Sequence, residues 1–166
     1  MWKLIAKFCA KPAVTAWLIA RAEKTPYTHI KKDNGSVYMR RLWLFNPYDK
    51  VHKSHWRRWF PSVRLHHIQR PDLDRHKHDH PWDARTIILS GSYHETRLEW
   101  REWMDSSVLA EVKYCRLPGD TAPLRFGEYH QIDAISPGGV WTMFITWKYQ
   151  GTWGFLVDGQ KVPYRE

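Results

Sequence analysis

Short runs of apolar residues, each bounded by glycine, proline or asparagine, fill the chain from about residue 37 onward and most strongly constrain its fold. We expect strands at Val37–Phe45, Val63–Gln69, Arg85–Leu89, Ser92–Trp100, Glu111–Arg116, Tyr129–Ile135, Val140–Tyr149 and Trp153–Val157. The turns between them lie at Ser90-Gly91, 118–120, 136–139 and 158–159. Many short strands without intervening helices are typical of an antiparallel sandwich or barrel. The sequence therefore predicts an all-β domain over residues 36–166.

The N-terminal segment, residues 1–26, has a helical pattern instead. Apolar residues recur at helical spacing from Trp2 to Cys9, and Pro12 suits the first turn of a second helix. The apolar run at 13–20 is too short to cross a bilayer, and nearby lysines with an internal proline fit a secretory signal poorly. We expect two short helices within residues 2–24, packed outside the β domain. Attachment of this basic segment to a membrane surface stays the alternative.

Composition limits the classes of protein that this chain can belong to. Its 166 residues include 43% hydrophobic residues and 11 tryptophans, enough for one packed domain. Cys9 and Cys115 are far apart and form no metal-binding spacing, so we expect a reducing, cytoplasmic compartment without a disulfide framework. The net charge of +9 favours anionic partners. Because the basic residues are scattered, nucleic-acid binding is only an alternative.

Histidines carry the clearest chemical signal. The segment 75–82 places His76, His78 and His80 at alternate positions, and His130 follows fifty residues after His80. Alternate side chains of a strand share one face, so histidines of this segment can point into one site. Neutral imidazole is the commonest protein ligand for zinc, iron, copper and nickel. The sequence predicts a metal site with positions left open for water or substrate.

The spacing of these residues resembles the two motifs of the cupin superfamily, which are small jelly-roll β-barrels. The first motif has His-x-His, three or four residues, a Glu, six residues and a Gly; here His78-Asp79-His80 precedes Ala84, at the Glu position, and Gly91. In the second motif, a Gly is followed by Pro-x-Gly and a His. That motif corresponds to residues 119–130, with Arg125 in place of the proline and with Gly127 and His130 in register.

The resemblance covers roughly residues 63–157 and implies a cupin-type antiparallel jelly-roll barrel with the N-terminal helical segment outside. The His-Asp-His-Pro-Trp run at 78–82 also resembles small cupins carried by bacteriophages and bacteria, which implies the cytoplasm of a bacterial host. The implied metal ligands are His78, His80 and His130. Because Ala84 cannot ligate, the set is similar to the three histidines of thiol dioxygenases. It implies a divalent metal, Fe(II) first, with Zn, Ni or Mn as alternatives.

Two further residues leave the ligand set open. Asp83 lies one residue away from the Glu position, and a turn at Pro81 would let its carboxylate reach the metal. In an alternative register, His76 and His78 form the pair and Asp83 takes the Glu position. His66 and His67 are neighbours on an adjoining strand, so at most one of them faces inward.

Four other residues beside the motifs are candidate catalytic residues. Tyr93 and Tyr129 can donate a hydrogen bond or a proton to a bound substrate, although tyrosines in an aromatic wall give the same pattern. Arg85 and Arg125 can clamp a carboxylate or phosphate, with an ion pair to Glu128 as the competing role.

These observations lead to one leading function and two alternatives. We expect a metal-dependent oxygenase of the dioxygenase-like cupin type that acts on a small polar or anionic molecule. A metal-free isomerase or epimerase on a sugar-like substrate shares the barrel. A non-catalytic ligand-binding or interaction protein is the third class. A homodimer is expected only from the frequency of pairing among cupins.

Overall fold

The computed structural model describes residues 1–27, 29–31, 35, 37–48, 59–72, 76–103 and 106–164. Two helices precede a series of strands. In chain order these elements are α1 (Trp2–Cys9), α2 (Pro12–Ala22), β1 (Ile30–Lys31), β2 (Val37–Phe45), β3 (Ser62–Ile68), β4 (Trp82–Ser90), β5 (Tyr93–Trp103), β6 (Ser106–Arg116), β7 (Thr121–Leu124), β8 (His130–Ile135), β9 (Val140–Tyr149), β10 (Gly154–Val157) and β11 (Gln160–Pro163).

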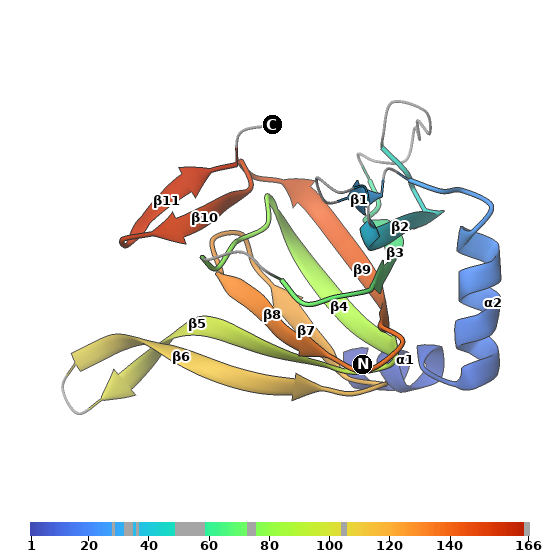
Figure 1. The fold of residues 1–166 in the computed structure, drawn as a ribbon, viewed down its shortest axis with the longest axis horizontal. Coiled ribbons are helices and arrows are strands. Elements are labelled where there is room, and N and C mark those ends of the chain that lie inside the picture. The colour runs from blue at the N-terminus through green and yellow to red at the C-terminus, as the bar shows by residue number, and fades with distance from the viewer. Residues whose placement is uncertain are drawn as a thin grey trace.

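The strands form antiparallel sheets (Figure 1). The larger sheet has the order β1-β2-β3-β9-β4-β7, and the smaller has the order β6-β5-β8. His78 pairs with His130 of β8 on one side and with Phe155 of β10 on the other, so it links the small sheet to the β10–β11 hairpin. A buried cluster joins the sheets: Ile68, Ile88 and Val140 come from the larger one, Tyr93 and Ile132 from the smaller.

Alternation along β3, β4 and β9 gives the larger sheet two different faces. Leu65, Ile87 and Met143 lie on the outer face and pack with the helices. Their neighbours along the strands face the interior between the sheets and are mostly polar, including Arg64, Thr86 and Thr142, all buried. Because a buried polar residue needs a partner or a ligand, this inner face is where function is expected.

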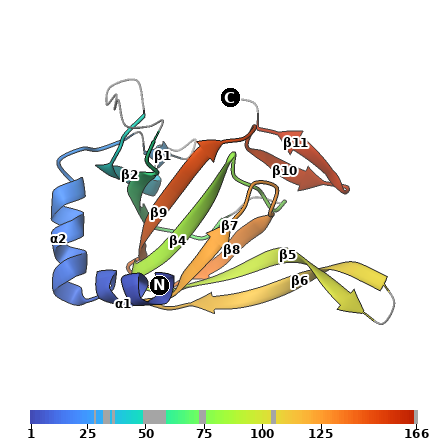
Figure 2. The same ribbon diagram turned by 180° about the vertical axis from the view of Figure 1, so that it is seen from behind.

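Helices α1 and α2 cover the outer face of the larger sheet (Figure 2). Ala6, Leu18 and Ala22 are buried there against the strands. Pro12 occupies the first turn of α2, where its missing N–H costs no hydrogen bond. The predicted all-β fold with two helices packed outside is confirmed. Among the described residues, neither helix has the length and apolar character that a membrane crossing requires.

The differences from the predicted strands have local causes. β6 begins at Ser106, five residues before the predicted Glu111, because β5 and β6 form a long hairpin that extends beyond the rest of the sheet (Figure 1). Its first four residues are exposed and lack an alternating pattern. β7 escaped prediction because it contains Pro123, which a strand at a sheet edge tolerates. The predicted loop at 48–61 and the turn at 33–35 lie largely outside the described residues.

Glycines close the turns of both sequence motifs. Gly91 has φ +74, and a Cβ at this position would lie 2.4 Å from the carbonyl oxygen of Gly139. Gly119 and Gly127 also have positive φ, +89 and +82. Only glycine adopts this backbone region without strain, so these motif positions serve the fold of the barrel rather than its chemistry.

Candidate metal centre

The three histidines predicted as ligands converge inside the barrel. His78 and His80 come from the segment before β4, and His130 is the first residue of β8. One nitrogen from each ring lies within 4.8 Å of the others. Ring centroids are 4.8 Å apart for His78 and His130, 5.1 Å for His80 and His130, and 5.3 Å for His78 and His80. This histidine trio is the candidate metal centre.

Backbone pairing holds the trio together. The amide of His78 donates to the carbonyl of His130 at 3.0 Å, and the amide of His130 donates back at 2.9 Å. Asp79 faces the opposite way and is fully buried, where it accepts from the amide of Gly154 and forms an ion pair with Lys161. The alternation predicted from sequence therefore directs His78 and His80 to one side and Asp79 to the other.

The spacing of the ring nitrogens suits a metal. Nε2 of His80 lies 2.9 Å from Nε2 of His130. Two imidazole ligands at right angles, each about 2.1 Å from a metal, would have nitrogens about 3.0 Å apart. Without a metal, the same distance accommodates an N–H···N hydrogen bond. Nδ1 of His78 is buried and has no hydrogen-bond partner among the described residues.

Two of the three rings, those of His78 and His80, have lowered pKa values. Burial, followed by the neighbouring His130, lowers the pKa of His78 to about 4. Burial, again followed by His130, also lowers the pKa of His80 well below its usual range. A neutral imidazole keeps the lone pair that a metal requires.

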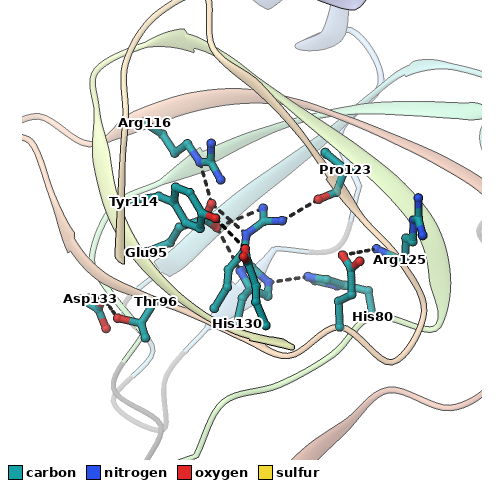
Figure 3. A network of polar contacts seen from close by, with 12 residues as sticks. His80, Glu95, Thr96, Tyr114, Arg116, Pro123, Arg125, His130 and Asp133 are labelled. Atoms are coloured by element: carbon teal, nitrogen blue, oxygen red, sulfur yellow. Dashed lines mark hydrogen bonds and ion pairs between the residues drawn. The ribbon is translucent and has the colours of Figure 1, made fainter. Parts of the chain in front are cut away.

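Glu95 lies beside His130, on the side opposite His80, as Figure 3 shows. It is fully buried on β5, and its Oε2 lies 3.4 Å from Nδ1 of His130. Arg97 and Arg116 approach its other oxygen at 3.0 and 2.6 Å. Burial alone would raise the pKa of Glu95, but His130 and the two guanidinium groups lower it to about 2. A carboxylate beside Nδ1 favours a proton there and leaves Nε2 free for a metal.

Sequence reasoning missed Glu95. The sequence feature that could have identified it is the run Tyr93-His-Glu95-Thr-Arg97, in which an acidic and a basic residue take alternate positions of one strand. Such alternation places both charges on a single face, and that face proves to be the interior.

Aromatic rings surround the trio. The centroid of Phe144 lies 5.3 Å from that of His80, while Trp153 and Phe155 lie 6.0 and 6.3 Å from His78. His130 is 6% exposed, whereas His78 and His80 keep more accessible surface. The trio thus has an apolar surround and a side that solvent can reach.

The two predicted tyrosines lie near the motifs without packing on the trio in the described part of the chain. Tyr93 is buried with Ile68 and Ile88, and burial together with the charge of Glu95 raises its pKa. Tyr129 precedes His130 on the chain and faces the other way. Burial and the charge of Asp79 raise its pKa. A proton-donating role for either stays a prediction.

The two predicted arginines are directed away from the trio. The guanidinium of Arg85 lies 4.8 Å from the ring centroid of Trp2, on the outer face beside α1, and donates to the hydroxyl of Thr121 at 3.3 Å. Arg125 is exposed, and its side chain points away from the histidines (Figure 3). The anion clamp expected from this pair is not formed, because closeness in sequence does not decide which face of a strand a side chain occupies.

The alternative ligands also lie elsewhere. Asp83 is exposed and accepts from the amide of Phe126 at 3.0 Å. His76 is outside the group of convergent nitrogens, so the register with His78, His80 and His130 is the one that the structure forms. Ala84 is buried against Leu124 and Phe144 and contributes only to the apolar wall.

Comparison with known proteins supports the fold at low sequence identity. No family model matches, and no curated protein matches. Among solved structures, Fe(II)-HppE with the alternative substrate (S)-1-HPP has a TM-score of 0.52 at 12% identity, over 76% of this chain and 57% of that one. Vicilin from hazelnut, Corylus avellana, has a TM-score of 0.57 at 9% identity over 79% of this chain and 35% of vicilin.

A cupin-2 domain from Rhodospirillum rubrum has a TM-score of 0.51 at 12% identity, over 79% of this chain and 74% of that one. This chain spans little more than half the length of HppE. Such likeness establishes a shared cupin fold.

Proposed function

We propose that this cupin-fold protein holds one divalent metal through His78, His80 and His130 and acts as a metal-dependent enzyme on a small anionic molecule. The observation that carries the proposal is the convergence of three imidazoles, one of which has a buried carboxylate beside its other nitrogen. Fe(II) is the metal we propose first, and oxygen insertion is the reaction class.

The three-histidine ligand set fits a catalytic metal better than a purely structural one. Three protein ligands leave positions open, as in catalytic sites. All three donors are neutral, so a bound metal would keep its formal 2+ charge and attract anions. When bound, the metal would supply Lewis acidity and a place for oxygen to bind. Imidazole ligands also suit zinc and nickel, so the choice of iron rests on the proposed reaction.

The chain's own residues have definable tasks in such a site. Glu95 orients the His130 ring through Nδ1, and Arg97 and Arg116 hold Glu95 in place. Asp79 fixes the segment between His78 and His80 to the β10–β11 hairpin. The aromatic rings limit the number of water molecules around the trio, which strengthens electrostatic interactions with a substrate.

The names of two structural neighbours support the proposed metal and substrate class without establishing either. HppE is described with Fe(II) and a substrate, and oxalate decarboxylase of Bacillus subtilis has a TM-score of 0.51 at 16% identity, over 82% of this chain and 31% of that one. The second name refers to a small carboxylate.

The proposal is tested by anaerobic reconstitution of untagged protein with Fe(II), Zn(II), Ni(II) and Mn(II), followed by oxygen-uptake measurements with small carboxylic acids. We expect tight binding of one Fe(II) and oxygen uptake that depends on an added acid. Oxygen uptake that is equal in wild-type and His130→Ala protein would contradict the proposed reaction.

The direct contact between His80 and His130 favours one alternative, a metal-free isomerase in which the paired imidazoles move a proton. Full activity on a sugar-like substrate after exhaustive chelation would establish it in place of the metal-dependent reaction.

A further inference from the structure

Arg64 is a buried cation that the metal site does not use. It lies on β3 opposite Trp43 and Phe144, faces the interior, and is 3% exposed. Its guanidinium carbon lies 4.9 to 5.6 Å from the centroids of four aromatic rings. These belong to Trp82, Phe144, Trp43 and Tyr48.

Within the described ranges, no carboxylate forms an ion pair with Arg64, and its Nε has no hydrogen-bond partner. Nε2 of His66, two residues later on the same face, is also buried without a partner there. This part of the interior therefore holds two buried polar atoms, Nε of Arg64 and Nε2 of His66, that lack a hydrogen-bond partner among the described residues.

The same residues border the histidine trio. The Phe144 ring stacks on His66 at 5.0 Å between centroids and lies 5.3 Å from His80. It also contacts the Arg64 guanidinium. One aromatic ring thus lies against both Arg64 and a proposed ligand, and the charge of Arg64 is close enough to His80 to contribute to its lowered pKa, after burial and the neighbouring histidines.

A buried charge without a counter-ion is unfavourable, and cation–π contacts offset only part of that cost. A guanidinium group donates two parallel hydrogen bonds to a planar carboxylate, the strongest arrangement of this kind. Because no described carboxylate balances Arg64, the anionic group of a ligand is a partner that fits it.

We propose that Arg64 is a substrate-recognition residue that binds the carboxylate of a small organic acid whose other end faces the histidine trio, with His66 as a further contact. This inference rests on the proposed function for the orientation of the substrate, and it names the substrate class as carboxylates of low molecular weight. It assigns to Arg64 the anion-binding role expected from sequence for Arg85 and Arg125.

Malonate is a suitable probe because its two carboxylates can bind at separate points. Its binding is measured by calorimetry, and by the rise in unfolding temperature that it causes, in both metal-free and Co(II)-loaded protein. The variants are Arg64→Met, which keeps much of the volume, and Arg64→Lys, which keeps the charge but loses the planar fork. Arg85→Met is the matched control, since it removes one arginine from the outer face of β4 in the same sheet.

We expect Arg64→Met to weaken malonate binding at least tenfold and Arg64→Lys to weaken it less, with metal content unchanged in both. Arg85→Met should bind malonate as the wild type does. Without malonate, Arg64→Met should unfold at the same temperature as the wild type or higher, because an unpaired buried charge has been removed. Malonamide, which carries no charge, should not bind, and methylphosphonate should bind more weakly than malonate.

Equal malonate affinity in wild type and both Arg64 variants would overturn the proposal. So would a wild type that binds no malonate, and a lower unfolding temperature of Arg64→Met would then show that the arginine serves the aromatic packing. If Arg64→Met does not fold, unchanged affinity in Arg64→Lys has the same meaning. A wild type that binds no metal would instead contradict the proposed function. Arg64 is tested separately, by malonate binding to metal-free protein.

Discussion

Oε2 of Glu95 lies 3.4 Å from Nδ1 of His130, and both side chains are buried at the centre of the barrel. The two residues come from adjacent strands, β5 and β8, so the distance is set by sheet pairing. A charged carboxylate at this distance favours a proton on Nδ1 of His130 and thereby presents Nε2 to the trio.

Glu95→Gln tests the orienting role. We expect affinity for Co(II) or Zn(II) to fall about 10- to 100-fold, because carboxylates behind metal-binding histidines have effects of that size. The measurement is competition with a chromophoric chelator. Glu99→Gln, on the same strand and with its own partners Arg101 and Tyr114, should leave the affinity unchanged.

Arg116→Met tests whether Glu95 affects metal binding by orienting His130 or through the overall stability of the protein. It removes one ion pair of Glu95 without touching His130 and leaves the pair with Arg97, so we expect a lower free energy of unfolding, by about 1–3 kcal/mol for a lost charged hydrogen bond, and little change in metal affinity. Denaturant unfolding and chelator competition give the two quantities. An equal loss of metal affinity in Arg116→Met and Glu95→Gln would show that Glu95 acts through overall stability.

Substitutions of the histidines test the ligand set. His78→Ala, His80→Ala and His130→Ala should each lose tight metal binding and remain folded by circular dichroism. His76→Ala and His94→Ala are the controls, since His76 lies outside the convergent group and His94 is exposed. Loss of metal in His76→Ala with retention in His80→Ala would establish the alternative register.

Much of the fold followed from sequence because alternation and turn residues are local signals. β2 and β9 have their predicted bounds, and the break between the helices falls before Pro12. The trio was predictable because His78 and His80 sit on one side of an extended segment. Glu95 and Arg64 were not, because their importance depends on which strands pair across the barrel. Arg85 was misassigned because closeness to a motif does not decide which face of a strand a side chain occupies.

Acid should destabilise the protein through His66. Burial, followed by the charges of Arg64 and Arg41, lowers the pKa of His66 well below its usual value of about 6.5. Below pH 6.5 the unfolded chain therefore binds a proton at His66 that the folded chain does not bind. The contribution of His66 to the free energy of unfolding is complete above pH 6.5 and is lost as the pH decreases. Each such histidine contributes a slope of about 1.4 kcal/mol per pH unit.

The variant His66→Gln should show a shallower loss of stability between pH 6.5 and 5 than the wild type, measured by urea unfolding of metal-free protein. The slope should not vanish, since the pKa values of His78 and His80 are shifted in the same direction. Identical slopes for the variant and the wild type would show that His66 is protonated in the folded state.

Gly91→Ala tests the packing of a motif glycine. Its positive φ alone costs about 1–2 kcal/mol for an alanine, and the new Cβ would also meet the carbonyl oxygen of Gly139 at 2.4 Å. Gly159→Ala is the matched control, with φ +76 and no atom within 4 Å of the added Cβ. We expect a clearly larger loss of unfolding free energy at Gly91; equal losses would mean that the turn shifts to make room.

Elemental analysis of untagged protein, after reconstitution and removal of loosely bound ions, tests the central claim most directly. The account predicts one tightly bound divalent metal per chain in the wild type and none in His130→Ala. A wild type that holds no stoichiometric iron, zinc, nickel, manganese or cobalt under these conditions would contradict it.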